Sequence, residues 1–115
     1  MEDWNGIKAY AKYGKFKVGN EQEKFRLEKS SFSGTAGDSL DYHNNMAFTT
    51  KDRDNDKFSG KCAVRWTGAW WYNNCLSANL NGKYFGNKRD TKGVIWNHFR
   101  SRLSLKWTEM KLRPS

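Results

Sequence analysis

Lys51-Asp52-Arg53-Asp54-Asn55-Asp56-Lys57-Phe58-Ser59-Gly60-Lys61-Cys62 is the most informative stretch of this 115-residue chain. Its alternating aspartates place hard carboxylate oxygens on one side of a short turn, and calcium prefers such ligands. The stretch is not an EF-hand: counted from Asp52, the expected glycine at position six is Lys57 and the expected glutamate at position twelve is Ala63. The residues alone leave two interpretations open, a calcium loop or a solvated acidic turn.

Cys62 and Cys75 are the two cysteines of the chain. Neither has another cysteine or a histidine two to four residues away, so their spacing excludes a zinc knuckle. The spacing does not decide between a disulfide and two free buried thiols.

The length and composition predict one folded domain. A chain of 115 residues supports one core of limited size. Its aromatic content of 16% favours a β-rich or loop-rich domain over a disordered chain. No stretch approaches the roughly 20 apolar residues that span a bilayer, and no signal-peptide pattern is present.

Alternation of residue types predicts two strands in the first third of the chain. Ala9 to Val18 alternates small or aromatic residues with lysines, which indicates a strand with one solvated face. After a turn at Gly19-Asn20, we expect a second strand from Glu23 to Ser31 with Phe25 and Leu27 pointing inward. A short helical turn is predicted for residues 34–40, and an ordered loop for residues 44–60.

The C-terminal segment also shows a strand pattern. Leu103, Leu105 and Trp107 share one face, and the phase then shifts by one residue to Met110 and Leu112. A shift of one residue in a strand is typical of a β-bulge. We therefore expect a bulged strand that ends before Pro114.

Positive charge is concentrated in the last third of the chain. Residues 82–115 carry seven of the nine net positive charges. A solvated basic surface is the plain interpretation, but this concentration favours an anionic partner. No nucleic-acid-binding motif is present, which argues against nucleic acid. The predicted patch consists of Lys88, Arg89, Lys92, Arg100 and Arg102.

Nothing in the sequence predicts catalysis. His43 and His98 are the two side chains whose ordinary pKa lies near neutrality, and neither sits in a nucleophile, metal or acid–base motif. We expect His43, next to Tyr42, to be a packed or loop-capping residue.

Several blocks, in the same order along the whole chain, resemble the fibrinogen C-terminal-like domain family. That family includes ficolins, tachylectins, angiopoietins, fibroleukin and tenascins. The matching blocks are Glu2–Gly6, Ser33–Leu40, Phe58, Gly60, Cys62, Gly68–Tyr72, Cys75, Asn79–Tyr84, Gly93–Trp96 and Glu109–Pro114.

The resemblance implies an α+β fold. We expect a small mixed or antiparallel sheet and a loop-rich subdomain stabilised by calcium and a disulfide. The match covers about the C-terminal half of the usual domain, so residues 1–115 are expected to form one domain that lacks the N-terminal subdomain. The sheet part is expected at about 1–40 plus a strand at 103–113, and the ligand and calcium part at about 41–102.

The resemblance also implies the calcium ligands and the cysteine pairing. Family members bind one calcium ion, which here corresponds to the side chains of Asp54 and Asp56 and the carbonyls of Phe58 and Gly60, with Asp52 behind them. The family pairs the two cysteines, which implies a Cys62–Cys75 disulfide and a secreted protein.

The ficolin–tachylectin branch has a ligand pocket beside this loop, next to a cis peptide that corresponds to Asn74–Cys75. Our chain has Leu76 in place of a histidine and Trp66 in place of a tyrosine, so we expect weak selectivity for acetylated sugars. The residues assigned to this pocket are Trp66, Trp71, Tyr72, Asn74, Cys75, Leu76, Tyr84, Asp90 and Thr91.

The sequence thus predicts a secreted, calcium-binding, non-enzymatic recognition domain of the innate-immunity type. Its expected ligands are microbial surface glycans or other anionic or acetylated carbohydrates, among them lipopolysaccharide, teichoic acid and glycosaminoglycan. The alternative is an extracellular-matrix or receptor-binding module, for example one that binds an integrin. A structural fragment without a ligand is the third interpretation.

Overall fold

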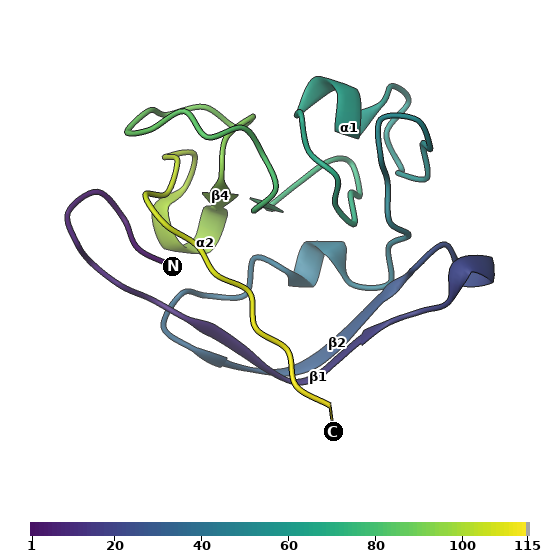
Figure 1. The fold of residues 1–115 in the computed structure, drawn as a ribbon, viewed down its shortest axis with the longest axis horizontal. Helices are drawn as coiled ribbons and strands as arrows, with labels where there is room; N and C mark the ends of the chain where they lie inside the picture. Colours follow the sequence, from purple (N-terminus) through teal and green to yellow (C-terminus); the bar gives the residue numbers. More distant parts are fainter. Residues whose placement is uncertain (115) are drawn as a thin grey trace.

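A two-stranded antiparallel ribbon forms one side of the molecule. β1 (Ala11–Val18) pairs with β2 (Leu27–Gly34), with Ala11 opposite Gly34 and Val18 opposite Leu27. The computed structural model describes residues 1–114. Figure 1 shows the ribbon along the lower edge, with most of the loop-rich remainder above it and the yellow C-terminal segment running down across it.

The inward face of the ribbon changes phase in its middle. Tyr13 is half-buried in the first half of β1, whereas Phe16 takes that role in the second half. Ser31, opposite this point, has a φ of 61°. A Cβ on Gly14 would lie only 2.9 Å from the Ser31 Cβ, so glycine permits this close approach. Val18 is in step with Phe16 but lies at the end of the strand, where it is 43% exposed.

The two strands are joined by a capped 3-10 turn, η1 (Glu21–Glu23). The Asn20 side chain accepts a hydrogen bond from the Glu23 amide, and the Glu23 carboxylate accepts one from the Asn20 amide. Our expectation for Phe25 is wrong: its φ is 56° and its side chain is 44% exposed. The strand therefore begins at Leu27, which is fully buried as predicted.

Short elements interrupt the loops of the remaining chain. β3 (Ala78–Asn79) pairs antiparallel with β4 (Ile95–Trp96) as a second two-stranded sheet that the sequence did not predict. The helical turn expected within residues 34–40 instead begins at Asp41. Residues 44–60 contain no helix or named strand, as expected of an ordered loop. The elements are η2 (Asp41–His43), α1 (Cys62–Arg65), β3 (Ala78–Asn79), β4 (Ile95–Trp96) and α2 (Asn97–Arg100).

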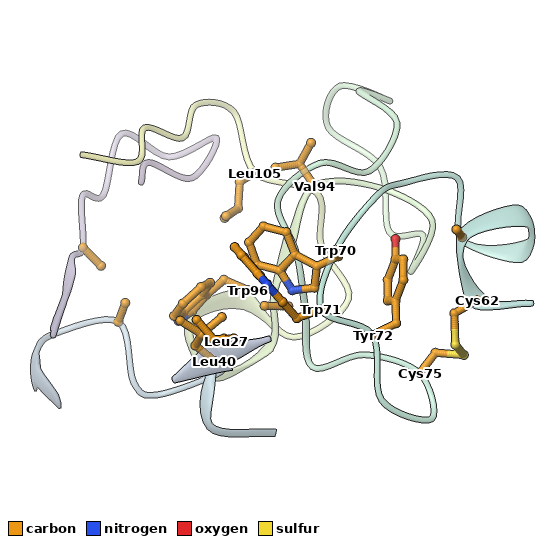
Figure 2. Close-up of a cluster of buried hydrophobic side chains, with 14 residues drawn as sticks. Leu27, Leu40, Cys62, Trp70, Trp71, Tyr72, Cys75, Val94, Trp96 and Leu105 are labelled. Atoms are coloured by element: carbon orange, nitrogen blue, oxygen red, sulfur yellow. A yellow bond between two sulfur atoms is a disulfide. The ribbon is translucent and has the colours of Figure 1, made fainter. Parts of the chain in front are cut away.

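Aromatic side chains fill the core between the ribbon and the loops. The rings of Trp70 and Trp71 lie 5.0 Å apart, edge to face. Figure 2 shows Trp96 beside them and Leu27 of the ribbon below, with Tyr72 nearer the disulfide. The core thus joins segments that are far apart in sequence.

An ion cluster around the buried Lys29 also attaches the ribbon to the loops. The Lys29 ammonium donates to Asp38 at 2.6 Å and to Asp41 at 2.7 Å, and Tyr13 donates its hydroxyl proton to Asp38. Burial alone would raise the pKa of Asp38, but these hydrogen bonds outweigh it and lower that pKa. Both partners of the Lys29–Asp38 pair therefore stay charged near neutral pH.

The C-terminal segment does not form the bulged strand that its pattern predicted. Leu103 and Trp107 each make one isolated bridge, to Arg89 and to Glu2 respectively. Leu105 is buried, whereas Trp107 is 48% exposed, so the two do not share an inward face. The alternating pattern had no neighbouring strand with which to pair continuously among the described residues.

Candidate binding clefts and acidic loop

The Cys62–Cys75 disulfide connects α1 to the loop that carries the candidate site. The Asn74–Cys75 peptide bond is cis. Both features agree with the sequence-based expectations. The Tyr42 hydroxyl donates to the Asn74 carbonyl at 2.7 Å, and the Asn73 amide group donates to the Tyr42 carbonyl at 3.0 Å. The disulfide loop is therefore also attached to η2.

His43 holds the two ends of this loop together from inside the protein. Its side chain is fully buried. Nδ1 lies 2.8 Å from the Trp71 carbonyl, and Nε2 accepts from the amides of Ser77 and Ala78, both at 3.1 Å. These partners require a neutral imidazole with its proton on Nδ1. Burial lowers the pKa of His43 to about 4. The expected packed histidine is thus confirmed, and it positions Ser77.

Residues 51–62, which we call the acidic loop, fold around Asp56. One oxygen of its carboxylate accepts from the Phe58 amide at 3.0 Å, and the other accepts from the Cys62 amide at 2.9 Å. Burial and the neighbouring carboxylate of Asp54 raise the pKa of Asp56. The Asp52 carboxylate instead accepts from the Thr50 hydroxyl at 2.6 Å.

Carboxylates and backbone carbonyls are the oxygen ligands that this loop could offer to a calcium ion. Within residues 1–114, no ion pair involves either Asp54 or Asp56. The described residues also contain no group of three or more His, Cys, Asp or Glu side chains that could hold a metal ion. A cation here would therefore need backbone carbonyls, such as those of Phe58 and Gly60, beside the two carboxylates. Calcium at this loop stays a prediction.

A cleft of about 390 Å³ opens beside the disulfide. We call it the arginine cleft, since Arg102 lies on its wall. The Trp66 indole donates to the Thr91 hydroxyl at 3.2 Å, and the Trp66 ring packs against Phe58 of the acidic loop, 5.8 Å between centroids. The lining residues are Trp66, Cys75, Leu76, Ser77, Thr91, Ile95, Asn97 and Arg102.

The arginine cleft brings together only part of the predicted pocket. Trp66, Cys75, Leu76 and Thr91 line it. The sequence pattern missed Ser77, Ile95 and Asn97 as members of this cleft, and it assigned Arg102 to the basic patch. The available signal was that Ser77 stands two residues after Cys75, while Ile95 and Asn97 lie in or directly after the Gly93–Trp96 block.

Five residues assigned to the pocket do not line either cleft. Trp71 and Tyr72 belong to the core, where the Tyr72 hydroxyl donates to Asn79 at 2.6 Å. Tyr84 is 60% exposed and donates to the Lys106 carbonyl. Asp90 caps the Lys92 amide, and Asn74 contributes its carbonyl to Tyr42.

The predicted basic patch is only partly assembled. Residues 88–90 run beside residues 102–104: the Asp90 amide donates to the Arg102 carbonyl, and the Ser104 amide to the Lys88 carbonyl. These contacts bring Lys88, Arg89 and Arg102 onto neighbouring segments. We call these three residues the basic ribbon, which is distinct from the ribbon of β1 and β2. Arg100 is instead paired with the buried Asp3 at 2.6 Å and stacked on Phe99. Its charge is therefore neutralised within the fold.

A second cleft of about 390 Å³ adjoins the first. We call it the tyrosine cleft. It shares Leu76 and Ser77 with the arginine cleft, so these two residues form the boundary between the two. The lining residues are Asp38, Asp41, Tyr42, Leu76, Ser77 and His98. None of the residues predicted for the pocket lies in it except Leu76.

Comparisons with known proteins agree with this architecture. Residues 1–115 match the family described as fibrinogen beta and gamma chains, C-terminal globular domain. The chain belongs to this fibrinogen C-terminal domain family. Chicken (Gallus gallus) tenascin-R is 48% identical over 107 residues, which cover 92% of this chain and 8% of tenascin-R. The predicted family and the α+β fold class are therefore confirmed.

Solved structures of fibrinogen-like domains superpose closely on the chain. The fibrinogen-like globe domain of human ANGPTL2 gives a TM-score of 0.86 at 45% identity, covering 92% of this chain and 51% of that one. Lamprey fibrin D-dimer, solved with the peptide ligand Gly-His-Arg-Pro-amide, gives 0.85 at 37% identity and covers 92% and 41%. The chain thus spans about half the length of a fibrinogen-like globe.

Membership of this family bears on what the chain does. Fibrinogen-like domains are binding and structural modules, not enzymes, in agreement with the sequence-based expectation. Within residues 1–114, no helix is long and apolar enough to cross a membrane.

The buried His43 makes stability depend on acidity. Between its ordinary pKa of 6.5 and its folded value of about 4, the unfolded chain binds a proton that the folded chain does not. The contribution of His43 to the free energy of unfolding is therefore fully present above pH 6.5. It falls by about 3 kcal/mol as the pH drops to about 4, at 1.36 kcal/mol per pH unit. Urea unfolding across this range measures the loss.

The variant His43→Gln is the matched control, because its amide can donate to Trp71 and accept from Ser77 without titrating. We expect its unfolding free energy to fall less steeply over the same range. Parallel curves for the two proteins would contradict a buried neutral His43.

Proposed function

We propose that this chain is an extracellular, calcium-binding recognition module that binds a partner protein through an acidic segment placed in the arginine cleft. The observation that carries the proposal is Arg102. Its side chain is exposed on the cleft wall, and within residues 1–114 it makes no ion pair. A planar guanidinium with free donors is the side chain best suited to bind a carboxylate.

The rest of the cleft supports a peptide ligand. Trp66, Leu76 and Ile95 offer apolar surface, while Ser77, Thr91 and Asn97 offer hydrogen-bonding groups. The cleft therefore combines apolar surface with an equal number of polar residues, which can fix the orientation of a ligand. The lamprey fibrin relative was solved with a short peptide ligand, which favours a peptide over a bare sugar here. Similarity to tenascin-R favours a matrix or receptor partner over a microbial glycan.

Calcium has a structural role in this proposal. We infer that Asp54, Asp56 and the carbonyls of Phe58 and Gly60 hold one ion. When bound, calcium would neutralise the two neighbouring carboxylates and stiffen the acidic loop. Phe58 packs against Trp66, so a stiffer loop also holds one wall of the arginine cleft. A disulfide and a calcium loop together suit an extracellular setting.

The basic ribbon favours a second candidate function, binding of anionic carbohydrate. Lys88, Arg89 and Arg102 lie on paired segments and are all exposed. A sulfated glycosaminoglycan, lipopolysaccharide or teichoic acid would contact this surface through charge rather than through a pocket.

Calcium binding is tested by melting the protein from a chelated sample. Added calcium should raise the melting temperature, since an ion at 100 times its Kd adds about 2.7 kcal/mol to stability when it binds only the folded state. The substitution Asp54→Asn should abolish this rise, because it removes one of the two charged ligands.

The control for charge alone is Glu21→Gln, which removes an exposed carboxylate from η1. It should keep the full calcium response. An unchanged melting temperature of the unaltered protein over a wide calcium range would count against the site.

The arginine cleft is tested with a library of short peptides with blocked ends, screened by fluorescence polarisation at physiological salt with calcium. We expect enrichment of peptides that contain aspartate or glutamate. Arg102→Gln should weaken their binding about tenfold, within the range for a charge-assisted hydrogen bond.

Arg113→Gln removes the same charge from an exposed position outside either cleft and should change little. Equal weakening by both substitutions would show that net charge, not the cleft, attracts the peptides. N-acetylglucosamine serves as a competitor, and displacement of the peptides by it would favour the acetyl-lectin interpretation instead.

The basic ribbon is tested by retention on heparin. Replacing Lys88 and Arg89 with alanine should lower the salt concentration at which the protein elutes, since exposed charges act over only about 8 Å at physiological salt. Replacing Lys12 and Lys17 of β1 removes the same charge from another exposed surface. Identical elution of the two double variants would reject a specific ribbon site.

A further inference from the structure

The tyrosine cleft has no role in the proposed binding of an acidic segment, yet its chemistry complements that of its neighbour. Its boundary with the arginine cleft is the pair Leu76 and Ser77, which line both. A ligand that crosses this boundary therefore meets Arg102 on one side and Asp41 on the other. Two adjoining clefts with opposite charge suit an extended ligand that carries both charges.

The outer surface of the tyrosine cleft is negative although a lysine lies behind it. The Lys29 ammonium group is shared by Asp38 and Asp41, so two carboxylates face one positive charge. The Lys29 side chain is only 5% exposed, whereas that of Asp41 is 73% exposed. A ligand in the cleft thus contacts the carboxylate, while the lysine holds this carboxylate in place from inside.

An aromatic face stands beside this carboxylate. Tyr42 is 41% exposed, and its ring is held in place by the hydrogen bond from its hydroxyl to the Asn74 carbonyl and by an edge contact with His43. A carboxylate next to a fixed aromatic ring is the usual environment for an ammonium or guanidinium group.

His98, which also lines the tyrosine cleft, is fixed in position as well. The His98 amide donates to the Ser39 hydroxyl at 2.8 Å, and that hydroxyl lies 2.8 Å from His98 Nδ1. Gly37 permits the close approach of His98, since a Cβ at this position would lie 2.5 Å from the His98 Cβ. Its φ of 77° is also one that glycine adopts readily. Because these walls are already fixed, the protein side chains lose little conformational entropy when a ligand binds.

We infer that the two clefts act as one bipolar groove: the tyrosine cleft binds the basic side chain of the same peptide segment whose carboxylate binds Arg102. This inference rests on the proposed function and specifies its ligand, a segment with one acidic and one basic residue. Leu76 and Ser77 contact the chain between them.

The test uses blocked peptides of the forms Lys-(Gly)n-Asp and Asp-(Gly)n-Lys, with zero to four glycines. Each is compared with an analogue in which glutamine replaces the lysine. The bipolar peptide has no net charge, whereas its analogue is negative. The net charge of the protein, +9, therefore attracts the analogue more strongly at long range. Tighter binding of the bipolar peptide consequently requires a local contact with its lysine.

For the best spacing, we expect the bipolar peptide to bind about three- to fivefold tighter than its analogue, the upper range for an exposed ion pair. Asp41→Asn should remove this preference, and Glu21→Gln should preserve it. The ratio of the two affinities is measured on one protein sample, so a partly unfolded variant still gives a valid ratio. Circular dichroism melting of Asp41→Asn reports its folding independently.

Four outcomes separate the hypotheses. A lysine preference that disappears in Asp41→Asn supports the bipolar groove. Binding that needs Arg102 but gains nothing from lysine at any spacing overturns the bipolar groove and leaves the proposed function standing. Peptide binding that is insensitive to Arg102→Gln overturns both. A lysine preference that survives in Asp41→Asn also rejects the assignment of this cleft.

Discussion

The buried imidazole of His43 is the contact on which the loop-rich part of this fold depends. In a domain with few helices and strands, most backbone donors and acceptors lie in loops and need other partners. His43 satisfies the Trp71 carbonyl and the amides of Ser77 and Ala78 at once. It thereby joins the two ends of the segment that contains the cis peptide and the second cysteine, and it places the residues shared by the two clefts.

Other polar side chains around the site also pair with backbone groups of the loops. Asp56 accepts from two backbone amides of the acidic loop, and Asn79 donates to the Trp66 and Gly93 carbonyls. Each polar side chain replaces the hydrogen bonds that a regular sheet would supply. Side chains with such fixed partners lose little freedom when a ligand binds, so a loop-built site can be as well defined as one built on helices.

Charge is divided between structural and exposed roles. Lys29 forms ion pairs with Asp38 and Asp41, and Arg100 forms one with Asp3. The three residues of the basic ribbon, Arg102 among them, stay exposed. The surplus of positive charge in the last third of the chain therefore overstates the charge available to a partner. What distinguishes the candidate site is the adjoining position of Arg102 and Asp41 on two clefts, a local pattern that net charge does not describe.

Local residue patterns determined part of this structure. The lysine alternation of β1, the buried Leu27 and the ordered loop at 44–60 follow from short-range preferences that act wherever the chain places these residues. The family motifs determined the fold class and the Cys62–Cys75 pairing, because several spaced blocks are more specific than any one of them.

Only the tertiary structure decided the rest. The alternation at residues 103–113 predicts a strand, but a strand needs a partner, and Leu105 and Trp107 meet different surroundings. Trp71 and Trp66 are both tryptophans near the disulfide, yet one is core and the other lines a cleft. Arg100 and Arg102 stand two residues apart, and only the position of Asp3, 97 residues away from Arg100, decides which of them is free. Such outcomes depend on contacts between distant segments, which no local pattern encodes.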